Sequence, residues 1–296
     1  MLLSTAHVVG NVALDETFRL DHLPRPGASA LADMAGRDLG GKGANVAVAI
    51  ARTGLPTRLV AAVGRDQAGD ALRARLAAEG LSGGLHAVAA PTDRSLILVE
   101  EGGENVVVTT HAAAASLTAA DIAAALEAAR AGDLVALQLN LPMSSTLAAL
   151  RAASARGCAT ALNPSPLRGP VPDEVWPLVD TAFLNAGEAA ALGGAERLHA
   201  LGVARVVLTL GAGGAAMSGP DGAVSAPAEP ARVVDPTGAG DAFMAVALAS
   251  AAWRGVALDG RGLRHGARAA ALVVARPGAV AALPSRDEMT AILASP

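Results

Sequence analysis

The sequence of 296 residues is poor in aromatic side chains: it has two Trp, three Phe and no Tyr, which together make up 2% of the chain. Proteins that bind single-stranded nucleic acid stack its bases on aromatic rings, so this class of function is excluded. Lys and Arg number 23 against 27 Asp and Glu, a net charge of −4, and the basic residues form no stripe. Duplex DNA or RNA is therefore not an expected partner.

Cysteine is also scarce, because Cys158 is the only one in the chain. One thiol can form neither an intrachain disulfide nor a metal site built from several cysteines, and this fits a reducing, cytoplasmic setting. The N-terminal residues lack the charged segment and cleavage site of a secretory signal. The longest apolar stretch, 242–253, is too short to span a bilayer, so we expect a soluble protein with no membrane partner.

Hydrophobic residues make up 52% of the chain and charged residues 17%, which predicts a folded protein with a large core. Short β-type runs alternate with alanine-rich helical stretches. This alternation is typical of βαβ units and predicts a mostly parallel sheet covered by helices. The predicted strands are 7–9, 59–63, 134–139, 159–162, 182–184 and 205–210, and the clearest predicted helices are 118–130 and 144–155.

One section breaks this alternation. Residues 95–100 and 105–109 flank a Glu-Gly-Gly-Glu turn at 101–104 with no helix between them, which predicts a hairpin outside the main sheet. The chain has no stretch with the composition of a linker and no internal repeat, so we expect a single domain.

An Asn or a Gly stands at the end of five predicted strands. In an open parallel sheet the carboxyl ends of the strands line the ligand crevice, so these residues are expected to border one site. Asn and Gly also end strands for purely local reasons, which is the alternative interpretation. The five residues are Asn11, Asn140, Asn163, Asn185 and Gly211.

A glycine-rich loop, Gly-Gly-Lys-Gly-Ala-Asn at 40–45, precedes a predicted helix. Glycine has no Cβ, so backbone amides in such a loop can approach the oxygen atoms of a ligand closely. With Gly36 the loop nearly matches a Walker P-loop, but Gly43 stands where the Mg²⁺-binding Ser or Thr should be. A tight turn that binds no ligand is the other interpretation.

A second loop, Asp-Pro-Thr-Gly-Ala-Gly-Asp at 235–241, precedes the predicted helix 242–253. Successive amides at a helix N-terminus form an anion site, which the helix dipole strengthens. A carboxylate at Asp241 beside a bound phosphate makes sense if it accepts the proton of a hydroxyl group to which the phosphoryl group is transferred. The alternative is that Asp241 only caps the helix.

Two further motifs are weaker. Residues 211–216 match the dinucleotide pattern G-x-G-x-x-A, but a hairpin turn at 217–222 follows instead of the required helix. Asn185 and Glu188 directly follow a predicted strand. The carboxylate could hold a hydrated Mg²⁺, or the two residues could simply begin a helix.

Together these motifs resemble those of the ribokinase-like sugar kinases, the PfkB carbohydrate kinase family, nearly from end to end of the chain. The resemblance is carried by 40–45, 185–188, 209–214 and 235–243. It implies an α/β fold of three layers, with a mostly parallel central sheet flanked by helices. Residues 1–296 would form a single domain, with a small β-sheet lid built from segments near 12–37 and 93–110.

The resemblance also implies a function. The γ-phosphoryl group of ATP, bound with Mg²⁺, would be transferred to a hydroxyl group of a small sugar, such as ribose or a related pentose or hexose. A homodimer would form through the lid. Asp241 would be the general base, and the amides of Gly238, Ala239 and Gly240 would form the anion hole.

Binding residues follow from the same resemblance. The expected sugar-binding residues are Asp15, Gly41, Lys42, Asn45 and Asn140. The expected ATP-binding residues are Asn185, Thr209, Gly211, Gly213 and Gly214, with Glu188 holding Mg²⁺ through water. A monovalent-cation site for K⁺ would comprise Asp235, Thr237, Val273, Arg276 and Gly278, although Ala282 replaces a Ser of that site.

Two positions depart from the ribose-phosphorylating members of the family. Ala13 stands where they have a sugar-binding Asn, and Asn140 where they have a Glu, so the sugar need not be ribose. A nucleoside kinase of the same fold, a non-catalytic sugar or nucleotide sensor and an NAD-dependent oxidoreductase are the alternatives. The intact Asp241 and 238–240 turn argue against a sensor, and the scarcity of aromatic residues argues against a nucleobase pocket.

Overall fold

The computed structural model of the protein describes residues 4–81, 83–101 and 105–296. The strands of its main sheet are β1 (Ala6–Val9), β4 (Thr57–Gly64), β5 (Leu85–Val88), β8 (Leu134–Gln138), β9 (Ala159–Asn163), β10 (Thr181–Asn185), β11 (Arg205–Thr209), β12 (Ala215–Gly219) and β13 (Gly222–Ala226). Within the described residues these nine strands lie in the order β13-β12-β11-β10-β9-β8-β1-β4-β5. The strands from β11 to β5 are parallel and the β12–β13 hairpin is antiparallel, so the predicted mostly parallel sheet is confirmed.

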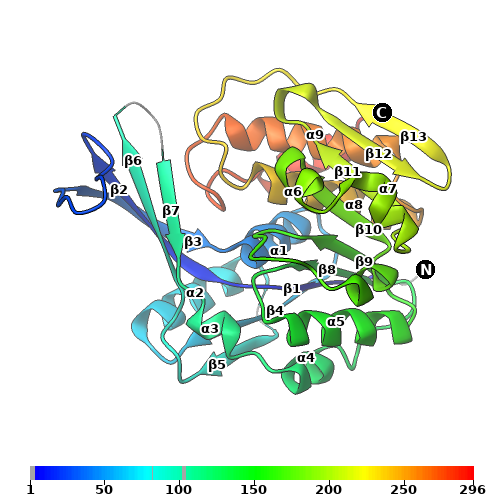
Figure 1. Ribbon diagram of the computed structural model, residues 1–296, viewed down its shortest axis with the longest axis horizontal. Helices are drawn as coiled ribbons and strands as arrows, with labels where there is room; N and C mark the ends of the chain where they lie inside the picture. The colour runs from blue at the N-terminus through cyan, green and yellow to red at the C-terminus, as the bar shows by residue number, and fades with distance from the viewer. Residues whose placement is uncertain (1–3, 82, 102–104) are drawn as a thin grey trace.

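Helices cover both faces of this sheet and make three layers (Figure 1). Alternate strand residues, such as Val8 and Val9, pack into separate hydrophobic cores on the two faces, as the two-residue period of a strand requires. One face carries α1 (Lys42–Arg52), α2 (Gln67–Ala78), α8 (Ala239–Arg254), α9 (Gly260–Val274) and α10 (Arg286–Ala294). The other carries α3 (Ala112–Ala115), α4 (Ala119–Ala125), α5 (Met143–Ala155), α6 (Ala186–Ala191), α7 (Gly194–Ala200) and the 3-10 helix η1 (Asp173–Leu178).

Two helix boundaries differ from the prediction. The helix predicted over 118–130 ends at Ala125, because the chain turns there while Leu126 and Ala129 still pack into the core. The helix predicted from 242 begins at Ala239, so the last part of the 235–241 motif forms its first turn. None of the helices in the described part of the chain is long and apolar enough to cross a membrane.

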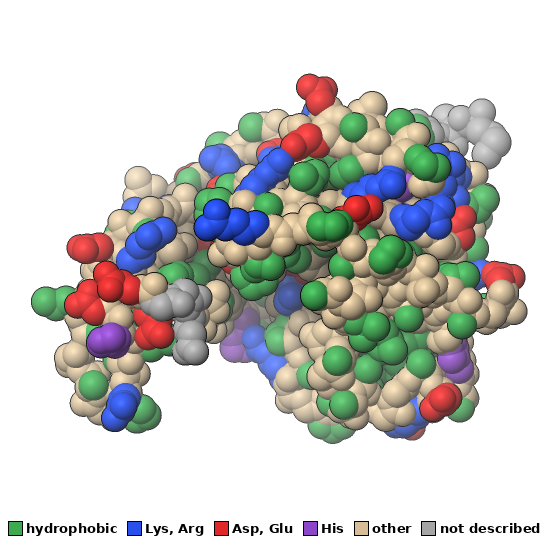
Figure 2. All heavy atoms as spheres, turned by 90° about the horizontal axis from the view of Figure 1, so that it is seen from above, with side chains coloured by type: hydrophobic (Ala, Val, Ile, Leu, Met, Phe, Trp, Pro, Cys, Tyr) green, Lys and Arg blue, Asp and Glu red, His purple; other side chains and the backbone are tan. Residues whose placement is uncertain are grey.

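A smaller sheet stands apart from the main one. It consists of β2 (Ala13–Leu20), β3 (Asp33–Gly40), β6 (Arg94–Glu100) and β7 (Asn105–Thr109), in the order β3-β2-β6-β7. The antiparallel β6–β7 pair is the predicted hairpin, although its turn at 102–104 lies outside the described residues. Because β2 and β6 are parallel, the sheet is mixed. Figure 2 shows it as a lobe at the left, with a notch between the lobe and the main body.

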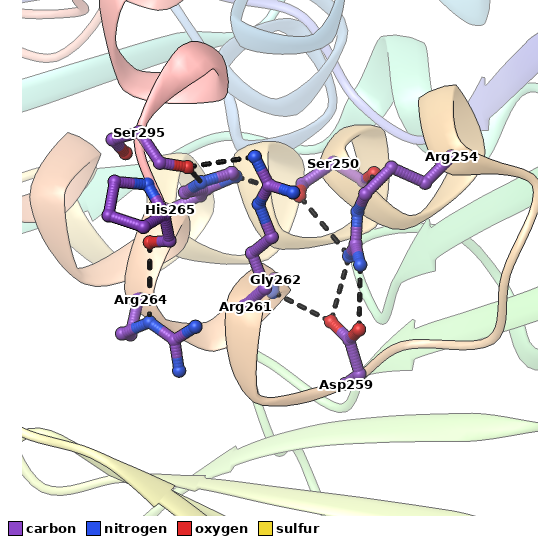
Figure 3. Close-up of polar contacts among 9 residues, drawn as sticks. Ser250, Arg254, Asp259, Arg261, Gly262, Arg264, His265 and Ser295 are labelled. Atoms are coloured by element: carbon purple, nitrogen blue, oxygen red, sulfur yellow. Dashed lines mark hydrogen bonds and ion pairs between the residues drawn. The ribbon is translucent and has the colours of Figure 1, made fainter.

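Paired polar groups fix the C-terminal end of α8 to α9 and α10 (Figure 3). Arg254 donates two hydrogen bonds to the Asp259 carboxylate, at 2.6 and 2.7 Å. The Ser250 hydroxyl lies 2.8 Å from Nδ1 of His265, and Nε2 of the same ring lies 3.0 Å from the Ser295 carbonyl. A carbonyl only accepts, so Nε2 carries the proton and Nδ1 accepts from Ser250. Burial lowers the pKa of His265, which favours this neutral ring.

Candidate active site

Asp241 lies in the first turn of α8 with only 5% of its surface exposed. Its Oδ2 accepts a hydrogen bond from Nδ2 of Asn45 on α1 at 2.8 Å, and Nζ of Lys42 lies 3.6 Å from Oδ1. The N-cap of α8 is Gly238, whose φ of 78° is in the left-handed region. The interpretation of Asp241 as a helix cap is therefore wrong: its carboxylate is bound by the loop at 40–45.

Close backbone contacts explain why this loop is rich in glycine. A Cβ on Gly43 would lie 2.6 Å from the backbone nitrogen of Asn11, and one on Gly40 would lie 2.0 Å from the Asp15 carboxylate. At Gly43 the contact is with backbone, which cannot move aside, so only glycine fits there; at Gly40 a Cβ would displace the Asp15 side chain. The glycines thus let α1 begin directly against β1 and β2, which carries the loop to Asp241.

A cavity of about 370 Å³ lies at the carboxyl ends of the strands. Its lining includes nine of the predicted residues: Lys42, Asn163, Asn185, Glu188, Thr209, Gly211, Gly238, Gly240 and Asp241. Ser165, Phe183, Leu184 and Pro236 complete the lining. The motifs that the sequence spreads over about two hundred positions therefore open into one space, as expected for the crevice of a parallel sheet.

The first turn of α8 offers backbone donors to this cavity. The N–H groups of Gly240 and Asp241 have no acceptor four residues back within the helix, whereas Ala239 N–H lies 3.3 Å from the Pro236 carbonyl. A Cβ on Gly240 would meet no described atom within 4 Å, so this residue faces open space. An anion at this position would meet the Gly240 amide and the positive end of the helix dipole.

Asn185 and Glu188 begin α6, as one of the two interpretations held, and they also line the cavity. The Glu188 N–H donates to Asn185 Oδ1 at 2.8 Å, and the Asn185 N–H donates to Glu188 Oε2 at 3.0 Å. Asn163 fixes the adjacent strand, because its Nδ2 donates to the Phe183 carbonyl at 2.9 Å. The capping box between Asn185 and Glu188 holds the Glu188 carboxylate, which lies on the β9–β10 side of the cavity, in a defined position.

Some predicted residues lie outside the lining of this cavity. Gly213 ends a 3-10 turn, and Gly214 is needed for the chain path, because a Cβ there would lie 2.2 Å from the Ala226 carbonyl. The residues that follow form β12, and the absence of a helix there excludes the dinucleotide interpretation. Asn140, just beyond β8, is also absent from the lining, and its Oδ1 is buried.

The residues predicted to hold a monovalent cation lie together. The Asp235 carboxylate accepts from the N–H groups of Thr237 and Gly278, both at 2.9 Å. The Gly278 bond and a bond from the Asp235 N–H to the Val274 carbonyl, at 3.1 Å, join residues 235–237 to residues 273–278. Within the second segment the Arg276 N–H donates to the Val273 carbonyl at 3.0 Å. Among the residues that the structure describes, no group of three or more His, Cys, Asp or Glu side chains is placed to hold a metal ion.

Buried polar atoms without a hydrogen-bond partner gather near the predicted sugar-binding residues. In the described residues these atoms include Oδ1 of Asp15, Asn45 and Asn140, Oδ2 of Asp38, and both amide atoms of Gln138. An unsatisfied buried polar group costs about 1–3 kcal/mol, so a polar ligand or water that completes these bonds is stabilised there. The sequence prediction missed Asp38 and Gln138, although polar residues near the ends of β3 and β8 were a signal for them.

Asp15, on β2, has an unusual carboxyl group. Burial raises its pKa to about 6, the negative charges of Asp38 and Asp241 add to the rise, and a hydrogen bond with Ser95 opposes it. The β2–β3 register places Asp38 directly opposite Asp15. Asp15 therefore titrates close to neutral pH.

Comparison with known proteins decides the family. Residues 7–286 match the model of the pfkB family carbohydrate kinases. The protein belongs to this family. The kinase is 32% identical over 301 residues to the ribokinase of Bacillus subtilis, with 97% of this chain and 98% of that protein covered. The enzyme class and the family that the sequence predicted are therefore confirmed.

Two further proteins are similar to the kinase. It is 28% identical over 303 residues to the bifunctional ribokinase/ribose-5-phosphate isomerase A of Fructilactobacillus sanfranciscensis, where it spans 97% of its own length and 55% of that protein. The structure of Arabidopsis thaliana ribokinase complexed with ribose and ATP superimposes with a TM-score of 0.87 at 25% identity, with both chains fully covered. This likeness confirms the predicted three-layer fold.

Proposed function

We propose that this kinase transfers the γ-phosphoryl group of ATP to a hydroxyl group of a small uncharged sugar, with Asp241 as the general base. One observation carries the proposal: the buried Asp241 carboxylate, held by Asn45, opens into the same cavity as Gly240 and Asn185. An acceptor hydroxyl beside Asp241 would then face a phosphate at the first turn of α8.

In this mechanism the acceptor hydroxyl gives its proton to Asp241 as its oxygen attacks the γ-phosphorus atom. The Asn45 amide, 2.8 Å from the carboxylate, fixes its orientation, and Lys42 adds a positive charge at 3.6 Å. The Gly240 amide and the dipole of α8 stabilise the negative charge of the phosphoryl group in transfer. The chain thus supplies a proton acceptor and an anion site within one helical turn.

Charge near the acceptor supports an uncharged sugar over a sugar phosphate. The negative charge of Asp241 lies close enough to Asp15 to raise the pKa of the Asp15 carboxyl group. Lys42 is already placed beside Asp241, and Arg94 on the neighbouring strand is paired with Glu16 at 3.0 Å. A second phosphate on the acceptor would meet net negative charge.

ATP would lie along the side of the cavity formed by Asn185, Thr209 and Gly211. Glu188 offers one carboxylate there, which suits a Mg²⁺ ion that keeps most of its water ligands. Bound Mg²⁺ neutralises charge on the phosphates. The Asp235 carboxylate and nearby backbone carbonyls are oxygen ligands of the kind that K⁺ takes. The Asp235 carboxylate also fixes the loop that leads into α8, because it accepts hydrogen bonds from the backbone of Thr237 and Gly278.

We also propose that the sheet of β2, β3, β6 and β7 is a lid over the sugar and a contact between two copies of the chain. Met34, Leu96 and the run Val106–Val108 are exposed on it, and β7 is an edge strand. An exposed apolar edge strand readily pairs with another chain. We expect a dimer by light scattering, and we expect Val107→Lys to give a monomer; a monomeric native protein contradicts this contact.

ATP-dependent release of ADP, measured with a panel of pentoses, hexoses, sugar monophosphates and nucleosides, tests the proposed function. We expect turnover of at least one unphosphorylated sugar, with ribose the first to test, and a phosphate ester in the ³¹P NMR spectrum of the product. Turnover of nucleosides alone would identify a nucleoside kinase. Binding of sugar and ATP without any turnover would identify a sensor.

A further inference from the structure

Asp38 has no role in the mechanism above, yet it lies beside Asp15, one of the sugar-binding residues that the family resemblance implies. In the antiparallel β2–β3 pair Asp38 is directly opposite Asp15, so both side chains stand on the same face of the sheet. Each carboxylate has one buried oxygen without a hydrogen-bond partner in the described residues. Like charges placed opposite each other are unfavourable, so this pair needs a compensating group or a ligand.

Arg75, on α2, supplies part of that compensation. Its Nη2 donates to Asp38 Oδ1 at 2.9 Å, and the Leu39 N–H donates to the same oxygen at 2.8 Å. The pair connects β3 of the small sheet to a helix of the main body. The Arg75 side chain is 60% exposed, so this ion pair contributes little to stability, and its main effect is on the local charge.

We propose that Asp38 and Arg75 are positioning residues that together set the charge of the Asp15 carboxylate in the sugar site. Asp38 adds negative charge beside Asp15, and Arg75 offsets it. The inference rests on the proposed function and on the expectation that Asp15 binds the sugar, whose hydroxyl groups would donate hydrogen bonds to its carboxylate. An ionised carboxylate accepts on both oxygens, whereas a protonated one has lost part of this capacity, so sugar affinity follows the charge of Asp15.

The other charged groups around Asp15 are already paired. Glu16, the next residue on the strand, accepts from Arg37 at 2.8 Å and from Arg94 at 3.0 Å. The strand on the other side of β2, β6, places the uncharged Ser95 opposite Asp15. Two further charges lie near this region: Asp241 of α8, whose negative charge acts on Asp15, and its neighbour Lys42 of α1.

Two variants should move the titration of Asp15 in opposite directions. The pKa of Asp15 is about 6, so kcat/KM for the sugar should fall as the pH falls below this value. Asp38→Asn removes a neighbouring negative charge and should shift this acid limb to lower pH. Arg75→Gln leaves the Asp38 charge without its partner and should shift the limb to higher pH. We expect each shift to be about 0.5–1 pH unit.

The test is the pH profile of kcat/KM for D-ribose, or for whichever panel sugar is turned over faster. Arg75→Lys, which keeps the charge, should leave the limb in place, and Arg75→Gln should have a smaller effect in the Asp38→Asn background, where Arg75 is no longer held by Asp38. The matched control is Arg151→Gln, which breaks an exposed ion pair with Glu174 of similar length, 2.7 Å. Thermal unfolding of each variant shows whether it is folded.

The outcomes separate the inference from the function on which it rests. Opposite shifts, with the limb unmoved in Arg151→Gln, support the inference. A limb that stays in place in both variants, or that moves in the same direction in both, overturns it while sugar phosphorylation stands. Absence of turnover of every sugar by the native protein contradicts the proposed function itself.

Discussion

Helix α8 joins two polar clusters of opposite character. At its C-terminal end Ser250, Arg254 and Asp259 are engaged in short hydrogen bonds with one another or with α9 (Figure 3), although Nε of the neighbouring Arg261 is buried without a partner in the described residues. At its N-terminal end Asp241 is bound by Asn45, but Oδ1 of Asn45 is buried with no partner in the part of the chain that is described. A completed network stabilises the fold, whereas an incomplete one costs free energy until a ligand completes it. We therefore assign stability to the C-terminal end of α8 and ligand binding to its N-terminal end.

The largest expected effect is at Asp241. Asp241→Asn removes the proton acceptor but keeps the size of the side chain and an oxygen for Asn45 to donate to. We expect kcat to fall by about a hundredfold or more, with thermal unfolding and ATP binding nearly unchanged. Steady-state kinetics and a thermal melt measure both quantities, and a cleanly folded variant with near-normal kcat would exclude Asp241 as the base.

Glycines at the two ends of the helix offer a matched pair. A Cβ would meet no described atom within 4 Å at either Gly240 or Gly255, but Gly255 has a φ of 64° and caps the helix. Gly240→Val should place its side chain in the anion site and lower kcat/KM for ATP by about tenfold to a hundredfold. Gly255→Val should leave the kinetics unchanged and lower the free energy of unfolding by about 1–2 kcal/mol. If both variants lowered kcat/KM for ATP equally, the proposed difference in function between the two ends of α8 would be wrong.

Breaking the ion pair at the C-terminal end should affect stability alone. Arg254 holds the pKa of Asp259 down at about 2, so the stabilisation is present above the ordinary carboxyl pKa and is lost as the pH falls towards 2. The Asp259 side chain is 45% exposed, which limits the effect of Arg254→Gln to about 1 kcal/mol at neutral pH. Urea unfolding should show that Arg254→Gln lowers the free energy of unfolding less at acid pH than at neutral pH. The kcat of the variant should stay within a factor of about two of the native value.

The smallest effect is expected at Asp15 and has the opposite sign. Its pKa of about 6 is above that of an ordinary Asp, so the folded protein favours the protonated form and loses stability as the pH rises from the ordinary value to about 6. A shift of about two units corresponds to about 3 kcal/mol, but the buried Asn amide also loses its water, so Asp15→Asn should raise the free energy of unfolding above that pH by about 1 kcal/mol and leave it unchanged in acid. Sugar turnover should fall in the same variant. A loss of stability at neutral pH would show that Asp15 is a structural residue.

The main sheet could be predicted because its strands are buried apolar runs between helices. Residues 159–162 and 182–184 were placed within about one residue of β9 and β10. In the small sheet the β6–β7 hairpin could be predicted from its turn, but β2 and β3 were expected through the family resemblance alone, since β3 is a mixed and mostly exposed sequence with no alternating pattern. Its register with β2, which places Asp38 opposite Asp15, depends on pairing between distant segments and leaves no trace in either segment.

The same limit applies to the site. The motif at 235–241 identified Asp241, but its contact with Asn45 joins residues 196 positions apart. In the sequence Gln138 is only a polar residue near the end of a predicted strand. The structure shows that both of its amide atoms are buried and have no partner among the described residues. A catalytic group that belongs to a local motif could be predicted from the sequence. Which buried polar atoms find a hydrogen-bond partner could not, because the partners come from distant parts of the chain.

The most direct test of the contrast between the two ends of α8 compares Asn45→Ala with Ser250→Ala. Titration calorimetry measures the equilibrium binding of the preferred sugar to each variant, and urea unfolding measures the free energy of unfolding of each. We predict that Asn45→Ala weakens sugar binding by about tenfold or more and leaves the stability unchanged or higher, whereas Ser250→Ala leaves binding unchanged and lowers the stability by about 1 kcal/mol. Native sugar affinity in Asn45→Ala, together with a loss of stability, would contradict the assignment of the N-terminal end of α8 to ligand binding.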